Sequence, residues 1–259
     1  MAVRARHVLC FLGGWRDFDV VERTIRAVGG EGFALDDEYS ALAPDPRMPR
    51  AFEASRDRVT PSFGDDDQAA VAKHRAVAYV LSPPMTPEAA PEISARMLRL
   101  VGAMLGGDGS PLAPSDRATA AKGESSGIAH GRDHWVSLAA SVTSDDPLER
   151  AAALTSAWVR RPLDDEDRGV FYSCGMHLLG EPDVEMPRLM EPMEAVRWID
   201  ALTIYLAAEK PEGGLRDGET FRPSEEDARR VLRSRACERY EEDDFFFNPN
   251  GYWNLVETR

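Results

Sequence analysis

The sequence has few cysteines, no long hydrophobic run and fewer basic than acidic residues, and each shortage excludes a class of protein. Its three cysteines, Cys10, Cys174 and Cys237, are widely spaced and form no C-x-x-C pair, which argues against a disulfide scaffold and a zinc ribbon. The most apolar helical stretch, residues 201–208, is far shorter than the roughly 20 residues that a membrane span needs. With 31 Lys and Arg against 45 Asp and Glu, the net charge of −14 leaves no basic stripe for a nucleic-acid backbone.

These shortages also bear on location and ligands. The apolar run at residues 8–12 is short and is soon followed by Arg16 and Asp17, which is typical of a buried first strand rather than a secretory signal. We therefore expect a cytoplasmic protein with reduced thiols and with neither a nucleic acid nor a membrane as its partner. No motif requires a cofactor or a metal ion, and we expect neither.

Apolar periodicity predicts an α/β (α+β) fold in which about three principal helices cover a mixed β-sheet. The helices are expected near residues 17–28, 87–105 and 192–208, because apolar side chains recur there every three or four positions. Strands are expected at residues 7–12, 76–81, 157–159, 170–178 and 229–235. We expect residues 1–259 to form a single domain, with its softest joint at the Gly-, Ser-, Pro- and Ala-rich residues 108–126.

Two glycines, Gly13 and Gly14, follow the first predicted strand and precede a helix, as in a phosphate-binding turn. The third glycine of G-x-G-x-x-G and the Lys-Ser/Thr of a P-loop are missing. The residues that follow, Trp15, Arg16 and Asp17, would crowd a pyrophosphate. We therefore interpret the glycine pair as a tight strand-to-helix turn.

A Gly-rich region at residues 123–134 offers an enzymatic alternative. Its G-E-S-S-G sequence places Ser125 where a nucleophile elbow has its serine, although no buried strand is predicted before it and no helix directly after it. His130 and His134 have the i, i+4 spacing of metal ligands on a helix, with Glu124 as the nearest third candidate. His177 could supply a base. This alternative function is that of a hydrolase or a metal-dependent enzyme. The competing interpretation of the same residues is a Gly/Ser loop, followed by a helix that leaves His134 at the surface.

Three acidic runs are candidates for a protein interface. Such runs would attract a basic partner, and aromatic residues near the last of them could anchor it. For each single run, the alternative is a solvated turn. The predicted partner-binding residues are Asp65, Asp66 and Asp67, then Asp164, Asp165, Glu166 and Asp167, then Glu241, Glu242, Asp243 and Asp244, together with Tyr252 and Trp253.

Three stretches of the second half resemble a bacterial family of unknown function. They are residues 124–130 (ESSGIAH), residues 172–177 (YSCGMH) with the following 178–184, and residues 248–253 (NPNGYW). Some members of that family occur beside secreted antibacterial toxins as presumed immunity proteins. The resemblance implies a cytoplasmic α/β domain and transfers no catalytic residue. Together with the acidic charge, it predicts an immunity-type protein that neutralises a basic toxin domain by direct binding.

Overall fold

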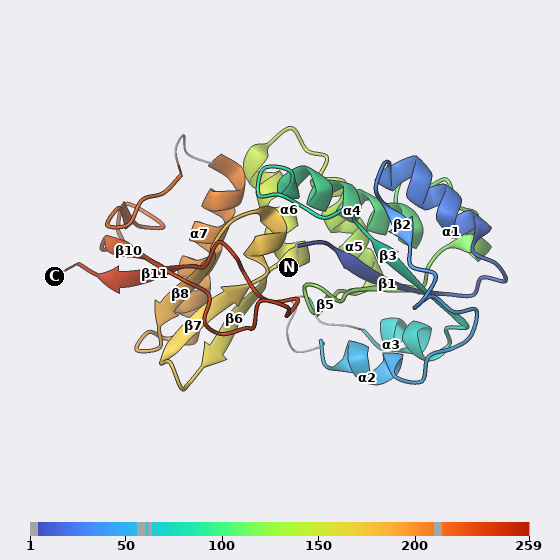
Figure 1. Cartoon of the computed structure of the whole chain (residues 1–259), viewed down its shortest axis with the longest axis horizontal. Coiled ribbons are helices and arrows are strands. Elements are labelled where there is room, and N and C mark those ends of the chain that lie inside the picture. The colour runs from blue at the N-terminus through green and yellow to red at the C-terminus, as the bar shows by residue number, and fades with distance from the viewer. Residues whose placement is uncertain (1–4, 56–60, 62–63, 210–213, 259) are drawn as a thin grey trace.

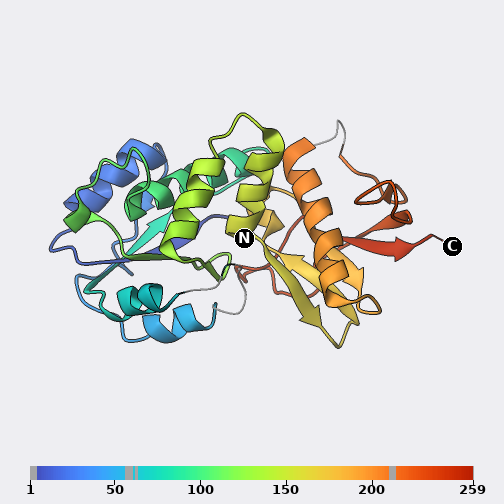
Figure 2. The ribbon, with the colours of Figure 1, turned by 180° about the vertical axis from the view of Figure 1, so that it is seen from behind.

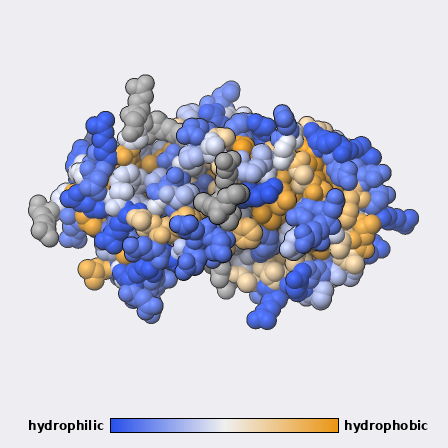
Figure 3. Space-filling view, in the orientation of Figure 1, coloured by the Kyte–Doolittle hydropathy of each residue, from blue (hydrophilic) through white to orange (hydrophobic). Residues whose placement is uncertain are grey.

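The computed structural model describes residues 5–55, 61, 64–209 and 214–258, and it contains two β-sheets that lie side by side along the long axis (Figure 1). The first sheet has five strands in the order β2-β3-β1-β4-β5, and the second has six in the order β6-β7-β8-β11-β10-β9. Helices cover both sheets, so the predicted mixed α/β fold is confirmed. Figure 3 shows more hydrophobic surface over the first sheet than over the second.

The first sheet is built around strand β1 and is antiparallel throughout. Side chains alternate along β1: Leu9 and Phe11 enter the main core, whereas Cys10 and Leu12 enter a smaller cluster on the opposite face, as the two-residue period of a strand requires. The strands are β1 (Val8–Gly13), β2 (Ala34–Leu35), β3 (Ala76–Leu81), β4 (Ala120–Gly123) and β5 (Ile128–Ala129).

Helices lie on both faces of the first sheet (Figures 1 and 2). The main-core face carries α1 (Asp19–Thr24), which continues as a π-helical turn over Ile25–Gly29, α4 (Ala90–Leu105) and α5 (Arg132–Ser141). The opposite face carries α2 (Met48–Glu53) and α3 (Asp65–Ala72), whose Met48, Phe52 and Val71 cover Cys10 and Leu12. Burial on both faces explains the continuous apolar character of β1 and β3.

The second sheet is mixed, because β8 and β11 run parallel while its other neighbouring strands run antiparallel. Helix α7 (Pro192–Glu209) covers one face and buries Trp198, Ile199 and Leu202 against it. The strands are β6 (Arg160–Asp165), β7 (Val170–Cys174), β8 (Asp183–Pro187), β9 (Thr220–Phe221), β10 (Arg230–Arg235) and β11 (Tyr252–Glu257).

One continuous hydrophobic core joins the two sheets. It includes Leu9 of β1, Val184 of β8 and, between them, Trp158 at the end of helix α6 (Pro147–Trp158). The ring of Trp158 lies 4.5 Å from that of His7, just before β1, and 5.5 Å from that of Trp135 in α5. The two halves therefore pack as one compact unit.

The three predicted helices are confirmed as α1 with its π turn, α4 and α7. The strand predicted at residues 157–159 is wrong, because helix α6 continues to Trp158. The missed signal is at the start of that helix, where the Asp146 carboxylate accepts a hydrogen bond from the Leu148 amide at 2.9 Å and Pro147 occupies the first turn.

Two further details differ from the pattern of the sequence. The strand predicted at residues 170–178 ends at Cys174, because Gly175 has φ 130° and a 3-10 turn over Met176–Leu179 follows. Within the predicted joint at residues 108–126, residues 120–123 form the buried strand β4 beside β1. Among the described helices, none is both long and apolar enough to cross a membrane.

Candidate binding surface at the C-terminal loop

Residues 236–251, here called the C-terminal loop, join β10 to β11 and cross the face of the second sheet that α7 leaves open (Figures 1 and 2). Beneath the loop, Tyr172, Cys174 and Tyr252 form a small buried cluster with Tyr240 and Phe246 packed against it. The loop is thus part of the fold of the second sheet.

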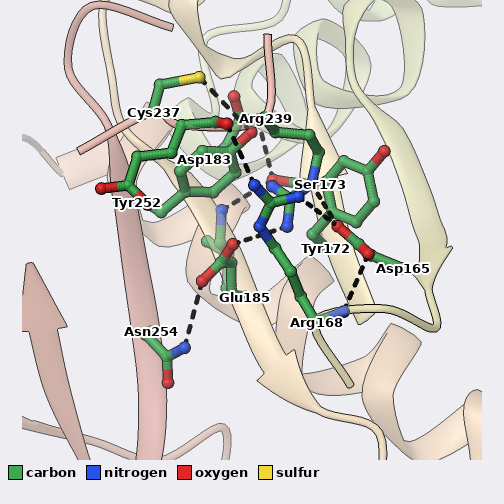
Figure 4. Close-up of polar contacts among 12 residues, drawn as sticks. Asp165, Arg168, Tyr172, Ser173, Asp183, Glu185, Cys237, Arg239, Tyr252 and Asn254 are labelled. Carbon is green, nitrogen blue, oxygen red and sulfur yellow. Dashed lines mark hydrogen bonds and ion pairs between the residues drawn. The ribbon is translucent and has the colours of Figure 1, made fainter. Parts of the chain in front are cut away.

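Arg239 is the main ionic anchor of the C-terminal loop (Figure 4). Its Nε donates to Asp165 of β6 and its Nη2 to Glu185 of β8, each at 2.9 Å. The guanidinium carbon lies 3.8 Å from the centre of the Tyr172 ring and 4.8 Å from that of Tyr252, so cation–π attraction adds to the ion pairs. Its side chain is only 8% exposed.

A second anchor is the buried carboxylate of Asp183 at the start of β8. It accepts hydrogen bonds from the Ser173 hydroxyl at 2.9 Å, the Met176 amide at 3.2 Å and the Asn248 side-chain amide at 2.7 Å. Burial raises the pKa of Asp183 to about 6, and these hydrogen bonds oppose the shift. Since Asn248 also donates to the Glu181 carbonyl at 3.0 Å, it holds the end of the loop against the sheet.

Two aromatic residues hold the middle of the loop. The Tyr240 hydroxyl hydrogen-bonds that of Tyr172 at 3.0 Å, and the ring of Phe246 lies 4.2 Å from the guanidinium carbon of the buried Arg160. Residues 241–245, here called the tip, are therefore held at both ends.

The tip presents acidic and aromatic side chains to solvent. Glu241, Glu242, Asp243 and Asp244 are all exposed, and Phe245 is 52% exposed. In the described part of the chain, no ion pair neutralises any of these four carboxylates. The tip thus combines unneutralised negative charge with an accessible ring on a segment that is held at both ends.

The other two predicted acidic runs are more engaged. In the β6–β7 turn, Arg188 pairs with Asp164 and with Glu166, each at 2.8 Å, while Asp165 pairs with Arg239. Asp167 is exposed. This run is therefore largely neutralised by arginines of its own sheet.

The run at Asp65, Asp66 and Asp67 forms the first turn of α3. The carboxylate of Asp67 accepts hydrogen bonds from the amides of Gly64 and Arg132, each at 3.0 Å, so it links α3 to the start of α5. Asp65 and Asp66 are exposed. Only two members of this run therefore remain available to a partner.

The two predicted aromatic anchors, Tyr252 and Trp253, lie inside the molecule. They are 2% and 8% exposed, because both belong to β11, which has a neighbouring strand on each side. Tyr252 packs under Arg239, and Trp253 belongs to the main core. The exposed ring beside the acidic charge is that of Phe245, which the sequence did not single out for this role.

A cavity of about 490 Å³ opens between the C-terminal loop and the sheet. Its charged lining includes Arg168, Arg235, Arg239, Glu185 and Glu238. Arg239 and Glu185 are already bound to each other, whereas Arg235 makes no side-chain hydrogen bond or ion pair within the described residues. Most charged groups of the cavity wall are therefore already engaged in the contacts that hold the loop.

The structure separates the candidate residues of the Gly-rich region. Ser125 is 1% exposed and lies in the turn between β4 and β5, where its hydroxyl accepts a hydrogen bond from the Val8 amide at 3.1 Å. Glu124 forms a close ion pair with Lys122. Ser125 therefore holds a turn against the first strand, and no sharp strand-to-helix elbow surrounds it.

His130 and His134 do lie together, with ring centres 4.6 Å apart. His130 is buried, contacts the Ser156 carbonyl at 3.0 Å through Nε2, and has its pKa lowered to about 3, chiefly by burial and then by His134. Burial also lowers the pKa of His177 to about 4. Neutral imidazoles are suited to metal binding, but the described residues include no group of three or more His, Cys, Asp or Glu side chains that could hold a metal ion.

The network around the C-terminal loop was not predicted from the sequence. Arg239, Asp183 and Asn248 come from separate segments, and their contacts join residues 54 to 74 positions apart for Arg239 and 65 apart for Asn248 and Asp183. The one local signal in the sequence is a basic residue, Arg239, within the acidic segment that precedes β11. No family model, curated protein or solved structure matches the sequence or the fold.

Proposed function

We propose that the protein is an immunity-type binding protein that neutralises a toxin domain in the cytoplasm, and that the tip at residues 241–245 makes its primary contact. The observation that carries this proposal is the tip itself, an ordered acidic and aromatic segment whose carboxylates have no ion-pair partner in the described residues. The resemblance to a family with toxin-associated members supports the same role.

Order in the free protein favours binding by such a segment. A flexible loop loses backbone conformational entropy when a partner immobilises it, at a cost of roughly 1–2 kcal/mol for each residue. Here Arg239, Tyr240, Phe246 and Asn248 already hold the tip at both ends. Part of that cost is therefore met on folding.

The charge of the tip suits a basic partner. A toxin that acts on nucleic acids or nucleotides needs a cationic cleft, and an acidic segment inserted there would block substrate access. Complementary charge speeds encounter to about 10⁸ M⁻¹s⁻¹ or more at low salt. The net charge of −14 adds a long-range attraction that salt screens.

The test begins with affinity purification from the native cell, identification of the bound protein, and expression of that protein with and without this chain. We expect the captured protein to be basic and toxic alone, and to be harmless when this chain is present. Association rates should then be measured over a series of salt concentrations, and they should fall as salt rises.

A matched pair of variants assigns the contact to the tip. Glu241→Gln with Glu242→Gln removes two tip charges, and Glu225→Gln with Glu226→Gln removes two exposed charges elsewhere. We expect the first pair to slow association at low salt by about tenfold and the second to have a much smaller effect. Equal effects, rates that ignore salt, or a captured protein without toxicity would each overturn the proposal.

A further inference from the structure

An open cleft of about 1110 Å³ lies at the turn between β1 and α1, on the first sheet. Three arginines line it: Arg16 in the turn, Arg23 in α1 and Arg75 just before β3. The Arg75 amide donates to the Gly13 carbonyl at 2.8 Å, which holds this residue beside the turn. A gathering of basic side chains is notable in a protein with a net charge of −14.

None of these three arginines has a side-chain hydrogen bond or ion pair with a residue in the part of the chain that the structure describes. Elsewhere, most arginines are engaged: Arg188 and Arg197, for example, each hold a carboxylate at 2.8 Å or less. Positive charge that the protein leaves unpaired around one cleft is available to an anionic ligand.

The turn between β1 and α1 forms part of the cleft wall, through Gly14, Trp15 and Arg16. The indole of Trp15 folds back over Gly13, so that a Cβ on Gly13 would lie 2.6 Å from it, and its Nε1 donates to the Asp116 carbonyl at 2.7 Å. The indole therefore covers Gly13, and its polar edge is turned to Asp116. Apart from the chain neighbours Gly13 and Trp15, no described residue comes within 4 Å of the place where a Cβ on Gly14 would lie.

The backbone amides of Gly14, Trp15 and Arg16 donate to no group among the described residues. Such amides commonly bind phosphate oxygens when positive side chains lie near them. The turn and the three arginines together thus offer two kinds of donor to one anion.

The rest of the lining indicates a ligand with more than an anionic group. Leu42 is 49% exposed and lies in the cleft with Pro44, where both can contact an apolar ring. Asp17 and Asp116 also line the cleft. Their carboxylates would repel a simple polyanion but can accept hydrogen bonds from hydroxyl groups.

We propose that this cleft binds a nucleoside phosphate. In this arrangement Arg16, Arg23 and Arg75 hold the phosphate groups, Asp17 or Asp116 accepts from ribose hydroxyls, and Leu42 contacts the base. The size of the cleft is sufficient, since pockets for small ligands have volumes of roughly 300–1,000 Å³. This site is separate from the tip and does not depend on the proposed function.

The test is calorimetric titration of the full chain with ADP, adenosine and inorganic phosphate. We expect ADP to bind more tightly than either of the other two, because only ADP uses both parts of the cleft. Each of Arg16→Ala, Arg23→Ala and Arg75→Ala should weaken ADP binding by about tenfold, the usual effect of losing one hydrogen bond to a charged group. Leu42→Ala should weaken ADP and leave phosphate unchanged.

The control is Arg216→Ala, which removes an exposed arginine outside the cleft whose side chain has no hydrogen bond or ion pair with any described residue. Its affinity for ADP should equal that of the unaltered protein. Three results would overturn the proposal: no ADP binding, phosphate binding as tight as that of ADP, or the same loss of affinity in Arg216→Ala as in the cleft variants. Thermal unfolding of each variant, measured without ligand, separates lost binding from lost folding.

Discussion

Arg239 on the second sheet and the three arginines of the cleft on the first sheet have opposite surroundings. On the second sheet, Arg239 is buried between two carboxylates and two tyrosine rings. At the cleft on the first sheet, Arg16, Arg23 and Arg75 have no such partners within the described residues. Side-chain partners therefore distinguish Arg239, which holds the fold, from the three cleft arginines, a distinction that the sequence alone does not contain.

The largest expected effect is on the free energy of unfolding at acid pH. It should depend on buried titratable groups and not on the cleft residue Arg75. Burial lowers the pKa of His7 to about 3, that of His130 to about 3 and that of His177 to about 4. Between pH 6.5 and about 4, the unfolded chain binds protons that the folded protein does not. The free energy of unfolding should therefore fall with decreasing pH, by about 1.4 kcal/mol per pH unit for each histidine.

Asp183 works in the opposite direction. With a pKa of about 6, it binds a proton in the folded protein at a higher pH than in the unfolded chain, so acidification from pH 6 to about 4 favours folding at this group. In Asp183→Asn this offset is lost, and the fall in stability should steepen by about 1.4 kcal/mol per pH unit. Urea unfolding at pH 6.5, 5.5 and 4.5 measures the slope, and Arg75→Ala should keep the original one. An unchanged slope in Asp183→Asn would contradict the role given to its buried carboxylate.

The next effect concerns Arg239 directly. Arg239→Met keeps much of the side-chain volume but leaves Glu185, which is 5% exposed, buried without its cation. Removing one partner of a buried ion pair costs about 3–5 kcal/mol. Arg75→Met, in the cleft, should change stability by less than about 0.5 kcal/mol. Denaturant midpoints at pH 7 compare the two, and similar losses would remove the distinction between the two groups of arginines.

The smallest expected effect is at the tip. Glu241→Gln with Glu242→Gln should leave the free energy of unfolding within about 0.5 kcal/mol of the original, because both side chains are exposed and unpaired in the described structure. Thermal and urea unfolding both test this. A loss of more than 1 kcal/mol would mean that the tip stabilises the fold and is not free for a partner.

Local patterns explain how much of the fold could be predicted. The helix at 87–105 and the strand at 76–81 have continuous signals, namely a three-to-four-residue apolar period and an unbroken apolar run, and both are present as α4 and β3. Helix α6 was missed because its apolar end, residues 157–159, was separated from its cap at Asp146. The apolar pattern at residues 157–159 is local and does not extend to the cap. The helix could be predicted only from the capping signal at its start.

The candidate sites depended on contacts that no local pattern contains. Arg239 lies 74 positions from Asp165 and 54 from Glu185, and only the register of the second sheet brings them together. The sequence predicts only a tight strand-to-helix turn at Gly13 and Gly14, because no local pattern shows where the Trp15 ring lies. The position of that ring is fixed by the hydrogen bond from the Trp15 Nε1 to the Asp116 carbonyl, 101 positions later in the chain.

The order of strands in the second sheet has a consequence for synthesis. Strand β11 (Tyr252–Glu257) lies between β8 and β10, so a strand that is synthesised after all the other strands of its sheet occupies an interior place in it. The first sheet has all its strands once Ala129 has been made. Until β11 has been made, strands β6–β8 and the pair β9–β10 are not joined, and their hydrogen-bonding edges are exposed. A chain whose synthesis stops before β11 would contain a complete first sheet and a second sheet in two separate parts. The exposed edges of those parts are the kind of surface that chaperones bind.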